Sequence, residues 1–315
     1  MTDLTAPANQ DWDALKARVD VQLRAITGAP EPDEPLVRTA VRESVMGAGK
    51  RVRPILVDLA ARDLGYDQPA ALQAGCAIEL VHTASLLLDD LPCMDDALTR
   101  RGKPTVHIRF GEDVAVLAAI AMLGDAFGLA ASVPGLSGEQ RSALTLSLSQ
   151  SVGMRGLVAG QYSDLRNVGN VSENNVVELN DQKTGSLFVS AVEMAGILAD
   201  ASAMQREQLR IYGLELGRAF QLFDDLLDVA GDAARMGKSN NKDAGKAVLA
   251  QGLGSKAMAE RIQAHLDTAL HALDHLPDGA PNLRAFTDKL FGKPAAGMQP
   301  HGGGKNGSVL TSLLA

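Results

Sequence analysis

The chain has 315 residues, of which 46% are hydrophobic and 3% aromatic, and it carries a formal net charge of −8. This composition is typical of a globular protein, and the acidic balance argues against a nucleic-acid-binding protein, which needs a basic face. The two cysteines, Cys76 and Cys93, have no metal-ligand spacing and cannot form a disulfide framework, which favours a reducing compartment.

The beginning of the chain carries no recognisable targeting signal. Residues 1–13 are polar and acidic and lack the apolar core of a signal peptide. The longest apolar run, 114–123, is shorter than the stretch of about 20 residues that spans a bilayer. We therefore expect a cytoplasmic protein without an integral membrane segment.

Apolar residues recur at three- and four-residue spacing along most of the chain, which predicts an all-α protein. The expected helices are, in chain order, 10–27, 33–63, 69–91, 111–132, 137–166, 172–199, 203–230, 256–277 and 281–292. No linker or repeat divides the chain, so we expect one large helical domain over 1–293. Glycine and proline are frequent after Lys293, which predicts a flexible tail over 294–315.

The segment 111–132 has hardly any polar face. A helix that is apolar nearly all round belongs in the core of a large bundle or in a subunit interface.

A first aspartate cluster, Asp89, Asp90, Asp95 and Asp96, follows a long apolar helix. Carboxylates so close together repel one another, at a cost of several kcal/mol in a partly apolar setting unless cations neutralise them. Pro92 cannot continue the helix comfortably, so the chain should turn there and re-aim Asp95. Taken alone, this cluster is more typical of a solvated helix end.

A second cluster, Asp224, Asp225 and Asp228, also interrupts an apolar helix. Asp224 and Asp228 are four residues apart and share a helix face. Two such clusters indicate a cavity between facing helices, and hard oxygen ligands that leave room for water and phosphate favour Mg²⁺.

Two basic segments accompany the aspartates. Lys50, Arg51 and Arg53 follow the small-residue turn 47–49, and Arg100 and Arg101 follow the first cluster. One arginine side chain can donate two hydrogen bonds to two oxygens of a diphosphate, and glycines allow the backbone to come close to a ligand. Either segment alone is typical of a solvated surface, but beside the aspartates they predict contacts to two separate diphosphates.

In this order the motifs resemble those of the trans-prenyl diphosphate synthases, the family of farnesyl and geranylgeranyl diphosphate synthases. Residues 89–95 match the family's DDxxxxD motif and residues 224–228 match its DDxxD motif. Further matches, between about residue 35 and residue 290, are GKRVRP at 49–54, ELVH at 79–82, RRGKP at 100–104, GQ at 160–161, KTG at 183–185 and FQ at 220–221.

The resemblance implies the isoprenoid synthase fold, a large helical bundle around a central cavity. It also implies a Mg²⁺-dependent, head-to-tail condensation of isopentenyl diphosphate with an allylic diphosphate (dimethylallyl, geranyl or farnesyl), with about three ions per active site. A homodimer is the family's usual assembly.

The resemblance also implies roles for single residues. The metal ligands are Asp89, Asp95 and Asp224, supported by Asp90, Asp225 and Asp228. The isopentenyl diphosphate pocket is made by Lys50, Arg53, His82 and Arg101. The contacts to the allylic diphosphate are Arg100, Lys183, Gln221 and Lys238. Thr184 and Gln221 direct oxygen dipoles at the allylic cation.

Product length should depend on the helix that ends at Asp89, because one helical turn of about 5.4 Å is close to one isoprene unit. The positions one turn earlier, Ala84 and Ser85, are both small, whereas family members that stop at fifteen carbons often have an aromatic residue there. We therefore expect the twenty-carbon product, geranylgeranyl diphosphate. The floor of the cavity that receives the growing chain could instead be set by Val81, Ile78 or Met122.

Three alternatives remain open from the sequence. The first is a farnesyl diphosphate synthase. The second is a class I terpene cyclase, which would not need the second diphosphate pocket of Lys50, Arg53, His82 and Arg101. The third is a non-catalytic regulatory subunit of a prenyl synthase, which would be expected to lose one of the two aspartate clusters.

Overall fold

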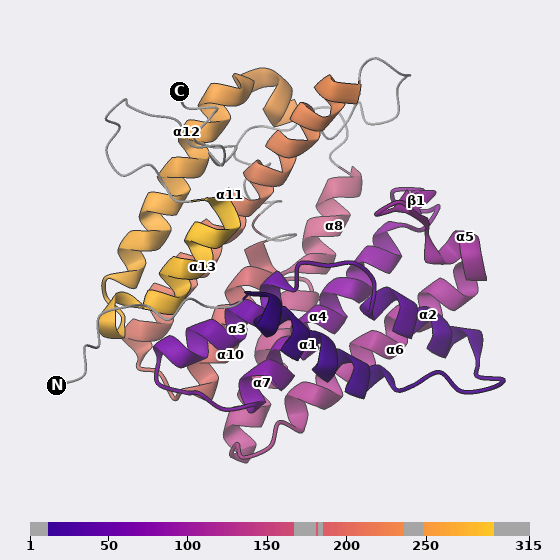
Figure 1. Ribbon diagram of the computed structural model, residues 1–315, viewed down its shortest axis with the longest axis horizontal. Coiled ribbons are helices and arrows are strands. Elements are labelled where there is room, and N and C mark those ends of the chain that lie inside the picture. Colours follow the sequence, from indigo (N-terminus) through magenta and orange to yellow (C-terminus); the bar gives the residue numbers. More distant parts are fainter. Residues whose placement is uncertain (1–11, 167–180, 182–184, 236–247, 293–315) are drawn as a thin grey trace.

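The structure, a computed structural model, describes residues 12–166, 181, 185–235 and 248–292 (Figure 1). The helices are α1 (Trp12–Thr27), α2 (Leu36–Val45), α3 (Val52–Asp63), α4 (Ala70–Asp89), α5 (Val106–Phe110), α6 (Glu112–Ala131), α7 (Gly138–Val152), α8 (Leu157–Arg166), α10 (Ser186–Leu198), α11 (Ala203–Arg235), α12 (Val248–Leu273) and α13 (Pro281–Phe291). A two-stranded hairpin, β1 (Thr99–Arg100) and β2 (Lys103–Pro104), and a short 3₁₀ turn, η2 (Pro277–Gly279), complete the described elements. The all-α prediction is confirmed.

Two of the expected helices are each divided in two. The segment 33–63 breaks between α2 and α3, where Arg51 takes the left-handed conformation with φ of 53°. The segment 137–166 breaks between α7 and α8 at Gly153 and Gly156, where a Cβ on Gly156 would lie 2.0 Å from the Ser151 carbonyl oxygen. Apolar periodicity continues across both breaks, so it does not show where the backbone turns.

Helix α4 lies in the middle of the bundle, packed against α3, α6 and α10 (Figure 1). Its side chains are buried along most of its length, because neighbouring helices cover several of its faces. Helix α3 approaches closely at Gly75, where a Cβ would lie 2.8 Å from Pro54 Cα. This contact holds the first turn of α3, with Arg53, beside α4.

The long helices α11 and α12 lie side by side, and α10 packs against α11 and joins this pair to α3 and α4 (Figure 1). The second aspartate cluster is therefore on a different wall of the bundle from the first. Helix α13 packs on α3, where the Asp63 carboxylate accepts hydrogen bonds from the backbone N–H groups of Asn282 at 3.0 Å and Leu283 at 2.8 Å. Asp63 thus supplies the cap for the start of α13.

The hairpin is an element that the helical periodicity did not predict. Thr99 pairs with Pro104 and Arg100 with Lys103, in antiparallel register. The turn between the strands is Arg101-Gly102, with φ of 53° and 77°, as the tight two-residue hairpin turn requires. The basic segment 100–104 is therefore a rigid turn rather than an extended loop.

Helices α4 and α6 are both 20 residues long and apolar enough to cross a membrane by length and composition alone. The apolar window of α4 is 72% buried within the protein, as befits a core helix, whereas that of α6 is only 39% buried. One side of α6 packs on α4, and the other exposes Leu117 (52%) and Ile120 (59%). The apolar helix expected at 111–132 is confirmed, and its outer face is open in the single chain.

Candidate functional site

A cavity of about 400 Å³ lies between α3, α4, α6, α7, α8 and α10. Its wall is mostly apolar, and includes Val81, Leu88, Leu123, Val152, Leu157 and Leu187. The polar or charged groups on it include Arg53, His82, Ser85, Asp89 and Gln161. An apolar chamber with a few convergent polar groups is the usual form of a small-molecule site.

The first aspartate cluster sits where α4 ends and the chain turns back. Helix α4 stops at Asp89, and the backbone N–H of Asp95 donates to the Asp89 carbonyl oxygen at 2.9 Å. A second bond, from Ala97 N–H to the Asp90 carbonyl oxygen at 3.2 Å, closes the same turn. The expectation that the chain turns at Pro92 and brings Asp95 back towards Asp89 is confirmed.

Asp90 differs from Asp89 in its surroundings. Asp89 lines the cavity, whereas Asp90 is buried and its two carboxylate oxygens each accept a hydrogen bond from Arg100 Nε at 2.9 Å. Burial lowers the pKa of Arg100, but the hydrogen bond and charge of Asp90 outweigh it, so this pKa is raised overall. Arg100 therefore stays cationic, and the pair joins the hairpin to the end of α4.

The small-residue loop 47–50 is held in place by two arginines. Arg51 is buried and donates to Asp20 at 2.8 Å, to Glu79 at 3.1 Å and to the Gly47 carbonyl oxygen at 3.2 Å. Arg101, on the hairpin turn, donates to the Ala48 carbonyl oxygen. Lys50, at the end of this loop, is exposed. The arginine contacts hold the backbone next to it in place.

Arg53 projects from the first turn of α3 and lines the cavity. It is buried, its guanidinium carbon lies 5.2 Å from the centre of the Phe188 ring, and its Nε has no hydrogen-bond partner among the described residues. Burial lowers the pKa of Arg53, while the charges of Glu79 and Asp224 act in the opposite direction. A buried guanidinium with an unused donor is suited to an anionic ligand.

His82 lines the cavity from α4. Burial, together with the charges of Arg53, Arg101, Arg100 and Arg51, holds the pKa of His82 well below its usual value. The imidazole is therefore neutral near pH 7, and it can donate one hydrogen bond to a ligand without adding to the positive charge.

The second aspartate cluster belongs to α11. Asp224 and Asp225 are partly buried, and Gln221 Nε2 donates to Asp225 at 2.9 Å. Asp224 is close enough to Arg53 to influence its pKa, so this cluster and α3 face a common region. Lys183, Thr184 and Lys238, as well as the side chain of Asp228, lie outside the described residues.

No group of three or more histidine, cysteine, aspartate or glutamate side chains within the described ranges converges closely enough to hold a metal ion. Mg²⁺ commonly takes only one or two protein carboxylates and completes its shell with water and substrate phosphates. The carboxylates of Asp89, which lines the cavity, and of Asp95, Asp224 and Asp225 in the two motifs are the hard oxygen donors that this ion prefers. These side chains fit an ion whose other ligands come from a diphosphate.

The two positions expected to govern product length differ in their surroundings. Ser85 lines the cavity, whereas Ala84 is fully buried and is not part of its wall. Val81 also lines the cavity, while the other two possible floors, Ile78 and Met122, do not.

Several contributors to the site were given no role from the sequence, although Gln161 and Glu79 belong to the GQ and ELVH matches. Leu157, Gln161 and Leu165 of α8 form one stripe on the cavity wall, and their four-residue spacing could have indicated a shared face. Glu79 is a buried counter-ion to Arg51, and a carboxylate inside an otherwise apolar helix was the available signal.

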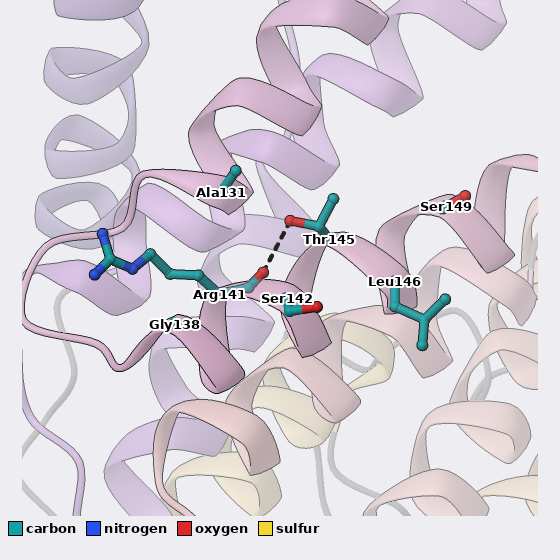
Figure 2. Close-up of a pocket in the computed structure, with 7 residues that line it drawn as sticks. All are labelled: Ala131, Gly138, Arg141, Ser142, Thr145, Leu146 and Ser149. Carbon is teal, nitrogen blue, oxygen red and sulfur yellow. Dashed lines mark hydrogen bonds between the residues drawn. The ribbon is translucent and has the colours of Figure 1, made fainter.

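A second depression, of about 560 Å³, lies on the surface between the end of α6 and α7 (Figure 2). Its residues are small, hydroxyl-bearing or apolar, with Leu146 exposed. Arg141, which extends away from Leu146 in Figure 2, donates to the carbonyl oxygens of Leu136 at 3.0 Å and Ser137 at 3.5 Å. This depression lacks the histidine and the carboxylate that line the first cavity, so the first cavity is the better candidate for a diphosphate site.

The chain is similar to known proteins along most of its length. The family model described as polyprenyl synthetase matches residues 34–261. A geranylgeranyl diphosphate synthase of Pseudescherichia vulneris is 41% identical over 297 residues, covering 93% of this chain and 95% of the relative. Another, of Pantoea ananas, is 42% identical over 269 residues, with coverage of 84% and 88%. Among solved structures, an FPP/GFPP synthase of Zymomonas mobilis is 30% identical with a TM-score of 0.77, covering 88% of this chain and 96% of the other.

Proposed function

Because the chain belongs to the polyprenyl synthetase family, we propose that it makes geranylgeranyl diphosphate by adding isopentenyl diphosphate to a shorter allylic diphosphate. It is a prenyltransferase of the trans-prenyl type. The observation that carries the proposal is the apolar cavity with Arg53, His82 and Asp89 on its wall. A hydrocarbon chain fits such a wall, and a diphosphate fits the charged groups.

The family generally depends on magnesium, and we assign about three ions to the site. Asp89, Asp95 and Asp224 would hold them, with Asp90, Asp225 and Asp228 in support. Bound Mg²⁺ neutralises the allylic diphosphate and makes it a better leaving group. Asp90 supports the site from a distance, since Arg100 occupies its carboxylate.

The isopentenyl diphosphate is assigned to Lys50, Arg53, His82 and Arg101. Arg53 offers an unused donor and a buried positive charge, while neutral His82 can add a hydrogen bond. Arg100, Lys183, Gln221 and Lys238 are assigned to the allylic diphosphate. The apolar wall excludes water, which protects the reactive allylic cation from hydrolysis.

The open face of α6 supports a homodimer. Leu117 and Ile120 are exposed on it, and the depression in Figure 2 begins at Ala131, the last residue of the same helix. Large exposed apolar patches commonly mark protein interfaces, and soluble homo-oligomers are most often two-fold dimers. We assign residues 1–293 to one catalytic domain and 294–315 to a tail. Both cysteines are free, which is consistent with the cytoplasm.

The test is a condensation assay with isopentenyl diphosphate, an allylic diphosphate and Mg²⁺, with the products separated after dephosphorylation. We expect elongated prenyl alcohols that require both substrates, and a loss of about 100-fold or more in kcat for Asp89→Asn and for Asp224→Asn. Consumption of an allylic diphosphate without isopentenyl diphosphate would instead indicate a cyclase. A folded wild-type protein inactive with every allylic diphosphate would indicate a regulatory subunit.

A further inference from the structure

Gln161 carries a carboxamide that is buried without a partner. Both polar atoms of this side chain, Oε1 and Nε2, are shielded from solvent and make no hydrogen bond within the described part of the chain. Leaving a buried polar group unsatisfied costs about 1–3 kcal/mol, so native proteins retain few such groups and those few call for a functional explanation.

Gln161 belongs to the wall of the cavity described above. Gln161 lines it from α8, with Leu157 and Leu165 one helical turn away on either side. Ser85, another uncharged polar residue on the wall, is satisfied because its Oγ donates to the His82 carbonyl oxygen at 2.9 Å. Gln161 therefore places an unpaired dipole in the wall of a chamber that is otherwise largely hydrocarbon.

Substrate binding does not relieve the cost of this arrangement. In the free enzyme both amide atoms are already shielded from water. The methyl and methylene groups of an isoprenoid chain neither donate nor accept strong hydrogen bonds. The carboxamide therefore gains no good partner in the ground-state complex. The unpaired amide therefore stabilises neither the free enzyme nor the ground-state complex with substrate.

The reaction itself generates a partner for the amide oxygen. The C1–O bond of the allylic diphosphate breaks, its electron pair leaves with the diphosphate, and positive charge spreads over C1 and C3 of the allyl group. The double bond of isopentenyl diphosphate then supplies the electron pair of the new C–C bond. The positive charge is then on the isopentenyl unit, and loss of a proton from C2 of that unit, to the released diphosphate, restores a double bond. An oriented carbonyl dipole is most effective against such a charge in a dry, low-dielectric cavity.

We propose that Gln161 is a catalytic residue whose side-chain oxygen faces the allylic carbons and stabilises the cation. The proposal rests on the prenyl-transfer function above. It differs from the roles implied for Thr184 and Gln221, because it follows from an unsatisfied group on the cavity wall. Gln161 forms no bond to the substrate, and its contribution is electrostatic.

The test replaces the amide with an apolar group of similar length, in Gln161→Met. We expect kcat to fall about 100-fold while KM for each diphosphate changes by no more than about twofold. Because the unsatisfied amide is removed, the midpoint of thermal unfolding should stay the same or rise. Gln150→Met, at an exposed glutamine of α7, is the matched control and should leave kcat and both KM values unchanged.

Two results would overturn the proposal while leaving the prenyl-transfer function intact. The first is a Gln161→Met enzyme with the kcat of the wild type. The second is a parallel fall in kcat and in the unfolding midpoint, which would show that the amide makes a structural hydrogen bond. Failure of the wild type to condense the two substrates would instead overturn the proposed function and this inference together.

Discussion

Arg100 Nε donates to both carboxylate oxygens of Asp90 at 2.9 Å, and Arg100 Nη2 lies 2.8 Å from Asp90 Oδ1. Asp90 is the C-cap residue of α4, and Arg100 is the last residue of β1. The pair therefore ties the hairpin to the helix end from which the aspartate turn begins. This brace closes the segment 90–100, which includes Asp95, while the bond from Asp95 N–H to the Asp89 carbonyl oxygen closes the turn between those two aspartates.

The brace predicts energetic coupling between its two residues. In a double-mutant cycle of Arg100→Gln and Asp90→Asn, we expect about 1–3 kcal/mol of coupling in the free energy of unfolding, because each single change leaves a charge without its partner. Urea denaturation of the four proteins measures it. The control is the exposed pair Arg210–Glu207, at 2.7 Å on α11, whose coupling should be clearly smaller because solvent screens it. Equal coupling in the two cycles would contradict the brace.

Ser85 and Ala84 should respond differently to a large side chain. Ser85→Phe places a ring in the cavity, so we expect a product shorter by at least one isoprene unit. Ala84 is fully buried outside the cavity wall, and Ala84→Phe should lower the free energy of unfolding by about 1–3 kcal/mol through overpacking. Product chromatography and urea denaturation of both variants separate the two effects. A Ser85→Phe enzyme that still makes the wild-type product would show that the floor lies elsewhere.

His82 predicts a pH dependence of stability with a defined sign. Its pKa in the folded protein is well below the usual value of 6.5, so the unfolded chain binds a proton at a pH where the folded protein does not. The wild type should lose stability relative to His82→Gln as the pH falls from about 7.5 to about 5.5. The loss begins near the unfolded pKa and continues towards the folded one. Urea denaturation across this range tests it, and a constant difference between the two proteins would refute it.

The outer face of α6 predicts how the assembly can be broken. Ile120→Glu places a charge in the proposed subunit interface, so we expect a dimeric wild type and a monomeric variant in sedimentation velocity experiments. Val21→Glu, at an exposed position of α1, introduces the same charge elsewhere and should stay dimeric. A monomeric wild type, or dissociation of both variants, would show that the α6 face is not the interface.

The sequence predicted those features that depend on local pattern. Apolar spacing predicted most of the helices, and Pro92 predicted the turn that brings Asp95 back to Asp89. The small residues at 47–49 indicated a turn, but the apolar periodicity ran on across it, and the hairpin was not predicted. At both places an arginine, Arg51 or Arg101, adopts the left-handed conformation and contacts a carboxylate or carbonyl group distant in sequence. Periodicity contains no information about such contacts.

Some functional residues could be recognised from sequence motifs, and others only from their surroundings in the structure. The motifs that include Asp89, Arg53 and His82 were recognisable from their order along the chain, and the structure places these three on one cavity wall. Gln161 was recognised only as part of the two-residue GQ match at 160–161, which implied no role for it. Its significance lies in the cavity wall to which it belongs, which is assembled from α3, α4, α6, α7, α8 and α10. No single segment contains that information.

The most direct test of the central claim is the length of the product made by the wild-type enzyme. Isopentenyl diphosphate, Mg²⁺ and each allylic starter in turn would be supplied, and the products separated by length after dephosphorylation. We expect a twenty-carbon alcohol as the main product from every starter that is accepted. A main product that stops at fifteen carbons would contradict it and identify a farnesyl diphosphate synthase.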